Sequence, residues 1–191
     1  MSRRAVGGWL LALALLPLCG GAAWWWWSGR HGGTLHGPAG PAPANAPAAK
    51  WVSFEIYFPA GDGTLKAERI DLQVSDAPKD RIRQIVQTLL TGKLGDGLAH
   101  SFPDGVVLGS VQLARDGTAF VDLRWPDHDE PPAGGSTEEM QRLYSVVDSI
   151  CKNVPQVSRV TFLWNGLQRD TFSGHLDTSR PLVPDLSLVA R

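Results

Sequence analysis

Four consecutive polar residues, Asp127, His128, Asp129 and Glu130, form the densest group of potential metal ligands in the chain. An imidazole with several carboxylates could bind a divalent cation. Neighbouring side chains on an extended loop point in different directions, however, and the flanking prolines stiffen this loop. We interpret residues 127–130 as a solvated loop suited to contact with a partner, and we expect neither a metal site nor a cofactor.

His175 and Asp177 are the second candidate pair, because a histidine base and an orienting carboxylate are two members of a hydrolytic triad. A hydrolase also needs an activated nucleophile, and the chain contains no Gly-x-Ser-x-Gly motif. Ser136 is explained by helix capping, while Ser145 and Ser149 lie along a predicted helix. We therefore expect no catalytic residue, and we keep hydrolysis through His175 and Asp177 as the alternative.

Three aromatic residues and three glycines are further candidates for binding elements. Trp125, Trp164 and Tyr57 could present an aromatic surface to a glycan or a peptide, but large aromatic side chains more often cover a sheet or fill a core. The glycines at 92, 95 and 97 follow a predicted helix instead of joining a strand to one. Their arrangement is therefore not that of a dinucleotide-binding loop.

The composition indicates one folded domain with an appended segment. Of the 191 residues, 43% are hydrophobic and 19% are charged, which is enough apolar surface for a packed core. Outside residues 1–49, which hold three arginines and no acidic residue, the net charge is −4. A phosphate backbone needs a positive surface, so we expect no nucleic-acid partner. Of the two cysteines, Cys19 lies in an apolar run, and we expect no disulfide to Cys151.

The N-terminal 27 residues predict a membrane anchor. Residues 5–27 carry no charge and are numerous enough to cross a bilayer as a helix. Arg3 and Arg4 favour a cytoplasmic N-terminus, and the tryptophans at 24–27 suit the far headgroup layer. We expect a single-pass anchor in the cytoplasmic (inner) membrane, with the rest of the chain in the periplasm or extracytoplasmic space. A cleavable signal peptide, lipidation at Cys19 and twin-arginine export remain alternatives, and each would also export the domain.

Residues 28–49 are rich in glycine, proline and alanine and predict a flexible linker. Residues 50–191 predict the globular domain. Within it, apolar and polar residues alternate over 51–58 and 67–74, which indicates two half-buried strands joined as an antiparallel hairpin. The Asp116-Gly117 and Asn165-Gly166 turns predict hairpins between strands 106–114 and 118–123 and between strands 159–164 and 167–172.

Two amphipathic helices are expected between these strands. Pro78 suits the first turn of one helix, Gly92 ends it, and the spacing predicts one buried stripe formed by Ile82, Ile85, Val86, Leu89 and Leu90. Ser136 and Glu139 have capping-box spacing at the start of the second, which runs to Cys151. The predicted class is α+β, a mostly antiparallel sheet with two helices packed on one face.

The order and spacing of several short motifs over residues 51–186 resemble those of the GerMN domain family of bacterial envelope proteins. No single motif is specific; the resemblance lies in their succession. It rests on Ile56-Tyr57-Phe58-Pro59, Leu89-Leu90-Thr91-Gly92, Phe102-Pro103-Asp104-Gly105, Asp116-Gly117-Thr118-Ala119-Phe120-Val121-Asp122-Leu123 and Gly135-Ser136-Thr137-Glu138-Glu139. Lys93 and Arg124 depart from it, since the family usually has proline and serine there.

The resemblance implies a fold similar to the ring-building modules of envelope-spanning machines, held at the bacterial cell surface. It also implies an interaction or scaffolding module without catalysis or a cofactor. Its partner would be an envelope protein or peptidoglycan, and residues 5–27 would contact the inner membrane. The alternative remains a protein that binds or hydrolyses peptidoglycan with His175 and Asp177.

Overall fold

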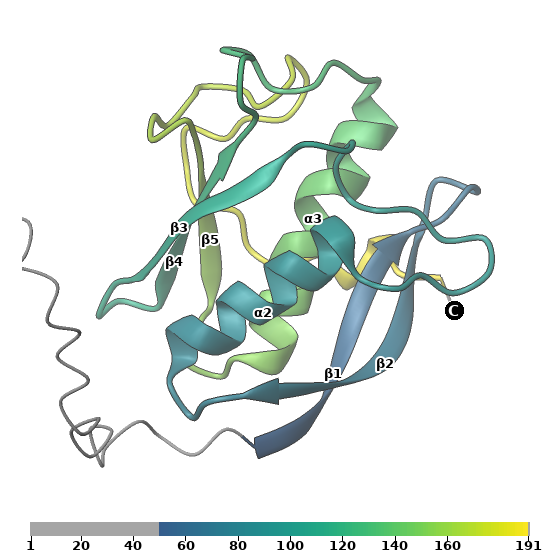
Figure 1. Cartoon of the computed structure of the whole chain (residues 1–191). Helices are drawn as coiled ribbons and strands as arrows, with labels where there is room; N and C mark the ends of the chain where they lie inside the picture. The colour runs from purple at the N-terminus through teal and green to yellow at the C-terminus, as the bar shows by residue number, and fades with distance from the viewer. Residues whose placement is uncertain (1–49, 191) are drawn as a thin grey trace, which may run out of the picture. The chain divides into compact units, whose positions relative to one another are not determined.

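The computed structural model describes residues 50–190. Within this range no helix is both long enough and apolar enough to cross a bilayer. The predicted anchor at 1–27 and linker at 28–49 lie outside the described residues. The elements in chain order are β1 (Lys50–Pro59), β2 (Leu65–Val74), α2 (Pro78–Thr91), β3 (Val107–Leu113), β4 (Thr118–Arg124), α3 (Ser136–Asn153), β5 (Arg159–Trp164) and the 3₁₀ turn η1 (Leu186–Leu188) (Figure 1).

The first hairpin forms as the alternation predicts. β1 and β2 pair antiparallel from Lys50 opposite Val74 to Pro59 opposite Leu65. Phe54, Ile56 and Phe58 are buried on the inner face, as the period of two requires. Tyr57, on the other face, is also buried, so this side of β1 is covered near its end.

The sheet arrangement differs from the prediction, although the α+β class is confirmed. The strands form two separate sheets, β1-β2 and β3-β4-β5, instead of one. β3 and β4 pair antiparallel, but β4 and β5 pair parallel. The parallel pairing follows from the connection, because α3 lies between β4 and β5 in the chain and a helical crossover brings the second strand back in the same direction.

The predicted last strand, residues 167–172, is wrong. Asn165 and Gly166 both have positive φ angles, which confirms the predicted turn. After that turn only a single bridge joins Leu167 to Trp164. The chain then leaves the sheet, and Leu182 pairs with Val160 on the same edge of β5, the edge away from β4. Phe172 is used in the core, where its ring lies edge-on to Trp164.

The two helices lie between the three-stranded sheet and the β1–β2 hairpin (Figure 1). In α2 the whole predicted stripe is buried, Pro78 occupies the first turn, and Gly92 is the C-cap residue. In α3 the buried apolar residues are Leu143, Val146, Val147 and Ile150. These stripes share one continuous core with the inner residues of β1, β4 and β5.

The capping box predicted for Ser136 and Glu139 is wrong. α3 has Gly135 as its N-cap residue, and no side chain caps the helix. The carboxylate of Glu139 is fully buried and turns to another segment of the chain. The spacing of a capping box concerns neighbouring residues only, so it does not show that the carboxylate bonds to a distant segment.

The outer edge of β1 is closed by polar side chains of α3. The amide of Tyr57 donates to Ser149 Oγ at 2.9 Å. The amide of Glu55 donates to Asn153 Oδ1 at 3.0 Å, and Asn153 Nδ2 donates to the Glu55 carbonyl at 2.7 Å. A helix therefore supplies the hydrogen bonds that a neighbouring strand would otherwise supply.

We predict that Asn153→Ala destabilises the protein by about 1–3 kcal/mol, because it leaves the amide and carbonyl of Glu55 without partners beneath the end of α3. Urea unfolding followed by circular dichroism measures this loss. Gln156→Ala, at an exposed position three residues beyond, is the control and should change stability by about 0.5 kcal/mol or less. Equal stabilities of the two variants would contradict the role of Asn153.

Candidate functional site

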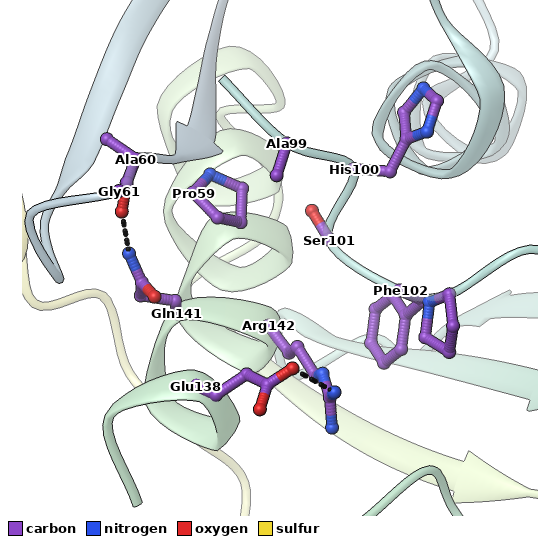
Figure 2. Close-up of a pocket in the computed structure, with 11 residues that line it drawn as sticks. Pro59, Ala60, Gly61, Ala99, His100, Ser101, Phe102, Glu138, Gln141 and Arg142 are labelled. Atoms are coloured by element: carbon purple, nitrogen blue, oxygen red, sulfur yellow. Dashed lines mark hydrogen bonds and ion pairs between the residues drawn. The ribbon is translucent and has the colours of Figure 1, made fainter. Parts of the chain in front are cut away.

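A hollow of about 390 Å³ lies between the end of β1, the segment 99–103 and the first turns of α3 (Figure 2). Its volume is within the range of small ligand pockets. Pro59, Ala60, Ala99 and Phe102 make much of the wall apolar. Most of its polar atoms already have partners in the fold, and those bonds determine what the hollow can do.

Gln141 and His100 hold the rims of the hollow in place. Gln141 Nε2 donates to the carbonyls of Ala60 and Thr64 at 2.8 and 2.7 Å, which fixes the β1–β2 turn against α3. His100 Nε2 lies 2.9 Å from the carbonyl of Gly92, so this ring nitrogen is the donor. The two side chains thus position backbone segments on opposite rims of the hollow.

Arg142 is the buried cation of the site. Its Nη1 donates to the carbonyls of Pro132 and Ala133 at 2.8 and 3.1 Å, and its Nη2 pairs with the Glu138 carboxylate. Figure 2 shows Glu138 and Arg142 side by side at the foot of the hollow. The guanidinium is therefore used to hold the segment before α3 and does not await an anionic ligand.

Ser101 is the only hydroxyl on the wall of the hollow, and it is not activated as a nucleophile. Its Oγ accepts from Ser145 Oγ at 2.7 Å, and the residue is buried. The nearby histidine, His100, is bonded to Gly92. A base must contact the hydroxyl that it activates, and this pair makes no such contact. The hollow is suited to binding an extended or apolar segment.

His175 meets a carboxylate, but not the one expected. Its Nδ1 lies 3.0 Å from Glu139 Oε2, while Asp177 accepts from the amide and hydroxyl of Ser179 at 2.9 and 2.6 Å. The pairing of His175 with Asp177, on which the alternative of hydrolysis depended, is therefore not formed. The structure instead joins His175, which is partly exposed, to a fully buried carboxylate on α3.

Glu139 also accepts hydrogen bonds from three backbone amides of the segment 173–176. Its carboxylate lies 2.8, 2.9 and 3.2 Å from the amides of Ser173, His175 and Leu176. Burial alone would raise the pKa of Glu139, but the bonds from Ser173, Leu176 and His175 outweigh it and hold the pKa below the usual 4.5. The ionised carboxylate thus fixes the segment 173–176 on the start of α3.

The 127–130 loop is organised by an arginine. Arg169 Nη2 lies 3.1 Å from Glu130 Oε1 and 3.0 Å from the carbonyl of Asp129. The ring of His128 stacks on Trp125 with a centroid separation of 3.8 Å. Among residues 50–190, no three histidine, cysteine or acidic side chains converge as a metal site would require.

The aromatic residues do not form a binding surface. Tyr57 and Trp164 are buried, and only Trp125 is partly exposed. Tyr57 donates to Glu55 at 2.7 Å. The interpretation of these residues as core and sheet cover is confirmed for Tyr57 and Trp164.

Asp148 is a buried acid that the sequence patterns missed. It lies on the core side of α3, and its Oδ1 accepts from the amide of Asp185 at 2.9 Å. Within the described part of the chain, Oδ2 has no hydrogen-bond partner. Burial raises the pKa of Asp148 to about 6. The same burial, with the Asp148 charge beside it, raises the pKa of Cys151 to about 11 and leaves that thiol unreactive at neutral pH.

Sequence reasoning could have noticed these polar residues from their positions in α3. Glu139 is spaced one, two and three helical turns from Leu143, Val146 and Ile150, so it extends a buried stripe towards the N-terminus. A charged residue on such a stripe indicates a buried charge with a partner. What the spacing does not reveal is the partner.

The family match decides what kind of domain this is. The family described as Germane, sporulation and spore germination, matches residues 55–170. The chain belongs to the Germane family. No curated protein is significantly similar to it in sequence.

Solved structures share the fold of this Germane domain. The tandem GerMN domains of the sporulation protein GerM from Bacillus subtilis align with a TM-score of 0.56 and 19% identity, over 70% of this chain and 46% of that one. The first GerMN domain of the same protein gives 0.53 and 20% over 70% and 96%. A candidate lipoprotein from Clostridium perfringens gives 0.50 and 20% over 71% and 88%.

Asp122, the acidic residue of β4, has a structural role in the Germane domain. Asp122 is buried, and its Oδ1 accepts from the amide of Gly166 at 2.7 Å, which fixes the turn after β5. Its Oδ2 lies 2.9 Å from Arg124, one of the residues that depart from the family pattern. Arg124 thus adds an ion pair between its exposed guanidinium and the buried carboxylate that anchors the turn.

We predict that Glu139→Gln destabilises the protein by about 2–4 kcal/mol at pH 7, because the amide is uncharged and has one acceptor oxygen for several donors. The folded pKa of Glu139 lies below the unfolded value, so its stabilisation is present above about pH 4.5 and is lost as the pH falls through the folded pKa. Urea unfolding at pH 7 and in acid measures both effects. Asp96→Asn, on an exposed loop, is the control. A pH-independent difference would contradict the role of the charge.

Asp148→Asn should act in the opposite sense. The folded pKa of Asp148 is raised from 3.8 to about 6, so its charge destabilises the fold increasingly between these values and fully above pH 6. We expect the variant to be more stable than the wild type by about 1–3 kcal/mol at pH 8 and equal to it near pH 3.5. Thermal unfolding across this range tests the prediction. A variant less stable at pH 8 than at pH 3.5, relative to wild type, would refute it.

Proposed function

We propose that the chain is a membrane-tethered module of the bacterial cell envelope that binds another envelope component outside the cytoplasm and catalyses no reaction. Membership of the Germane family carries the proposal. The uncharged run at 5–27, with arginines before it and tryptophans at its end, supports export and anchoring. A fold neighbour that is a candidate lipoprotein agrees with a position at the membrane surface.

The hollow beside α3 is the surface that we assign to the partner. Its rims are fixed by Gln141 and His100, so its shape is set before binding. Ala99 and Phe102 provide apolar contact, and Glu138 provides a partly exposed carboxylate. Such a surface suits a protein segment with an apolar anchor and a nearby positive charge.

A second candidate function is hydrolysis of peptidoglycan. The observation that favours it is the pairing of His175 with Glu139 at 3.0 Å, which has the form of a base with an orienting carboxylate. No hydroxyl or thiol nucleophile among the described residues is hydrogen-bonded to His175. The amides of 173–176 already use the same carboxylate, which favours a structural role.

The first test concerns topology and partner binding. In cells stripped of the wall, protease should remove a C-terminal tag from the full-length protein while sparing a cytoplasmic marker. Cross-linking should recover a defined envelope complex, and Ala99→Arg, which fills the hollow, should reduce its yield about tenfold or more. Gln156→Arg adds the same side chain at an exposed site away from the hollow and should leave the yield unchanged. A protease-resistant tag or equal yields for both variants would contradict the proposal.

The second arm separates binding from catalysis. Purified full-length protein is incubated with peptidoglycan, and soluble fragments are measured. We expect no turnover. Turnover that His175→Ala abolishes, in a variant that remains folded, would overturn the non-catalytic assignment and establish the hydrolase.

A further inference from the structure

The hydrogen bonds between β1 and α3 reveal which backbone groups of β2 point away from the hairpin. In an antiparallel pair, successive residues direct their amide and carbonyl groups to opposite sides. The groups of Glu55 and Tyr57 point to α3. Their partners across the hairpin, Arg69 and Ala67, must therefore point outward on the opposite edge.

The same alternation in the direction of the backbone groups continues along β2. Asp71 and Gln73, which lie opposite Ser53 and Trp51, also point outward. The carbonyl of Leu65, in the same register, accepts from the amide of Ala190 at 2.8 Å, which confirms the direction. Within residues 50–190, no such bond reaches the outward backbone groups of residues 67–73. Figure 1 shows β2 as the outer strand of the hairpin.

An open strand edge can pair with another strand. The charges on this edge indicate which charges the pairing strand must carry opposite them. The side chains of Arg69 and Asp71 are exposed and lie two residues apart. If a second copy of β2 pairs antiparallel about a two-fold axis at Ile70, Arg69 of each copy lies opposite Asp71 of the other. Opposite charges at such cross-strand positions are stabilising.

Neighbouring registers are rejected by the same residues. A shift that centres the axis on residue 69 places two copies of Arg69 opposite each other, and a shift to residue 71 does the same with Asp71. Like charges directly opposite are destabilising. The edge is therefore self-complementary in the register centred on Ile70, where the outward-pointing residues 67, 69, 71 and 73 of one copy lie opposite 73, 71, 69 and 67 of the other.

An apolar groove runs beside this edge. It has a volume of about 450 Å³, and Ile70, Leu72 and Leu94 are among its lining residues. In the register above, Ile70 of one copy lies opposite Ile70 of the other on the groove side of the strand. Pairing would thus cover apolar surface that the single chain leaves partly exposed.

We propose that the chain forms a symmetric homodimer through the outer edge of β2, so that β1-β2 of one copy and β2-β1 of the other make one four-stranded antiparallel sheet. A two-fold interface of this kind is self-complementary and closes on itself. We assign a second copy of the chain to this edge, because Arg69 and Asp71 on one β2 strand provide both charges of each cross-strand pair.

Cysteine cross-linking of the full-length protein in its membrane or in mild detergent tests the register. Ile70 lies on the axis in a non-hydrogen-bonded pair, where the separation of about 4.5 Å between Cα atoms permits a disulfide. We expect Ile70→Cys to form a dimer under mild oxidation. Glu68→Cys and Leu72→Cys, tested singly, should not, but differently tagged chains carrying one each should cross-link to each other. The parent chain, which retains Cys19 and Cys151, gives the background.

Charge reversal provides the independent control. Arg69→Asp creates two like-charge pairs in the symmetric dimer and should weaken association about tenfold, measured by analytical ultracentrifugation. The double variant Arg69→Asp with Asp71→Arg restores both pairs and should restore association. Both residues are exposed, so the fold is retained. Absence of dimer, cross-linking of Ile70→Cys no faster than Glu68→Cys alone, or association indifferent to Arg69→Asp would overturn the proposal.

Discussion

The fold depends on the polar side chains of α3, which satisfy backbone groups in segments far from it in sequence. Buried amides and carbonyls must have partners, and one helix supplies many of them. Asn153 serves β1, Gln141 serves the β1–β2 turn, and Arg142 serves the segment before the helix. Glu139 and Asp148 serve two segments that follow β5. The helix is thus the common support of five pieces of chain.

This arrangement explains why the domain can have two small sheets. A two-stranded hairpin is marginal on its own, but β1 gains a hydrogen-bonded neighbour from Ser149 and Asn153 and an apolar neighbour from the helices. The two edges of the hairpin differ, because α3 forms hydrogen bonds with the edge of β1 only. The edge of β2 remains open beside a groove, and whatever pairs there would complete the sheet.

Much of the fold could be predicted because it depends on short-range patterns. The stripe of α2 follows the helical period, and positive φ angles occur at Gly117 in the Asp-Gly turn and at both residues of the Asn-Gly turn. The division into two sheets could not be predicted, since alternation places side chains on a face but does not name the neighbouring strand. The strand predicted at residues 167–172 does not form, for a related reason. Phe172 packs in the core although its segment does not pair with a strand of the sheet.

The candidate site was harder to predict, because its residues act across the chain. The spacing of Ser136 and Glu139 fits a capping box, yet a buried carboxylate gains more from three converging amides and an imidazole than from one amide at an exposed helix end. Asp177 does not pair with His175 for a similar reason. Its carboxylate accepts from the amide of Ser179, which lies only two residues away in the sequence. The acids of α3 thus fix loops that no short sequence pattern connects to them, so their roles become visible only in the folded chain.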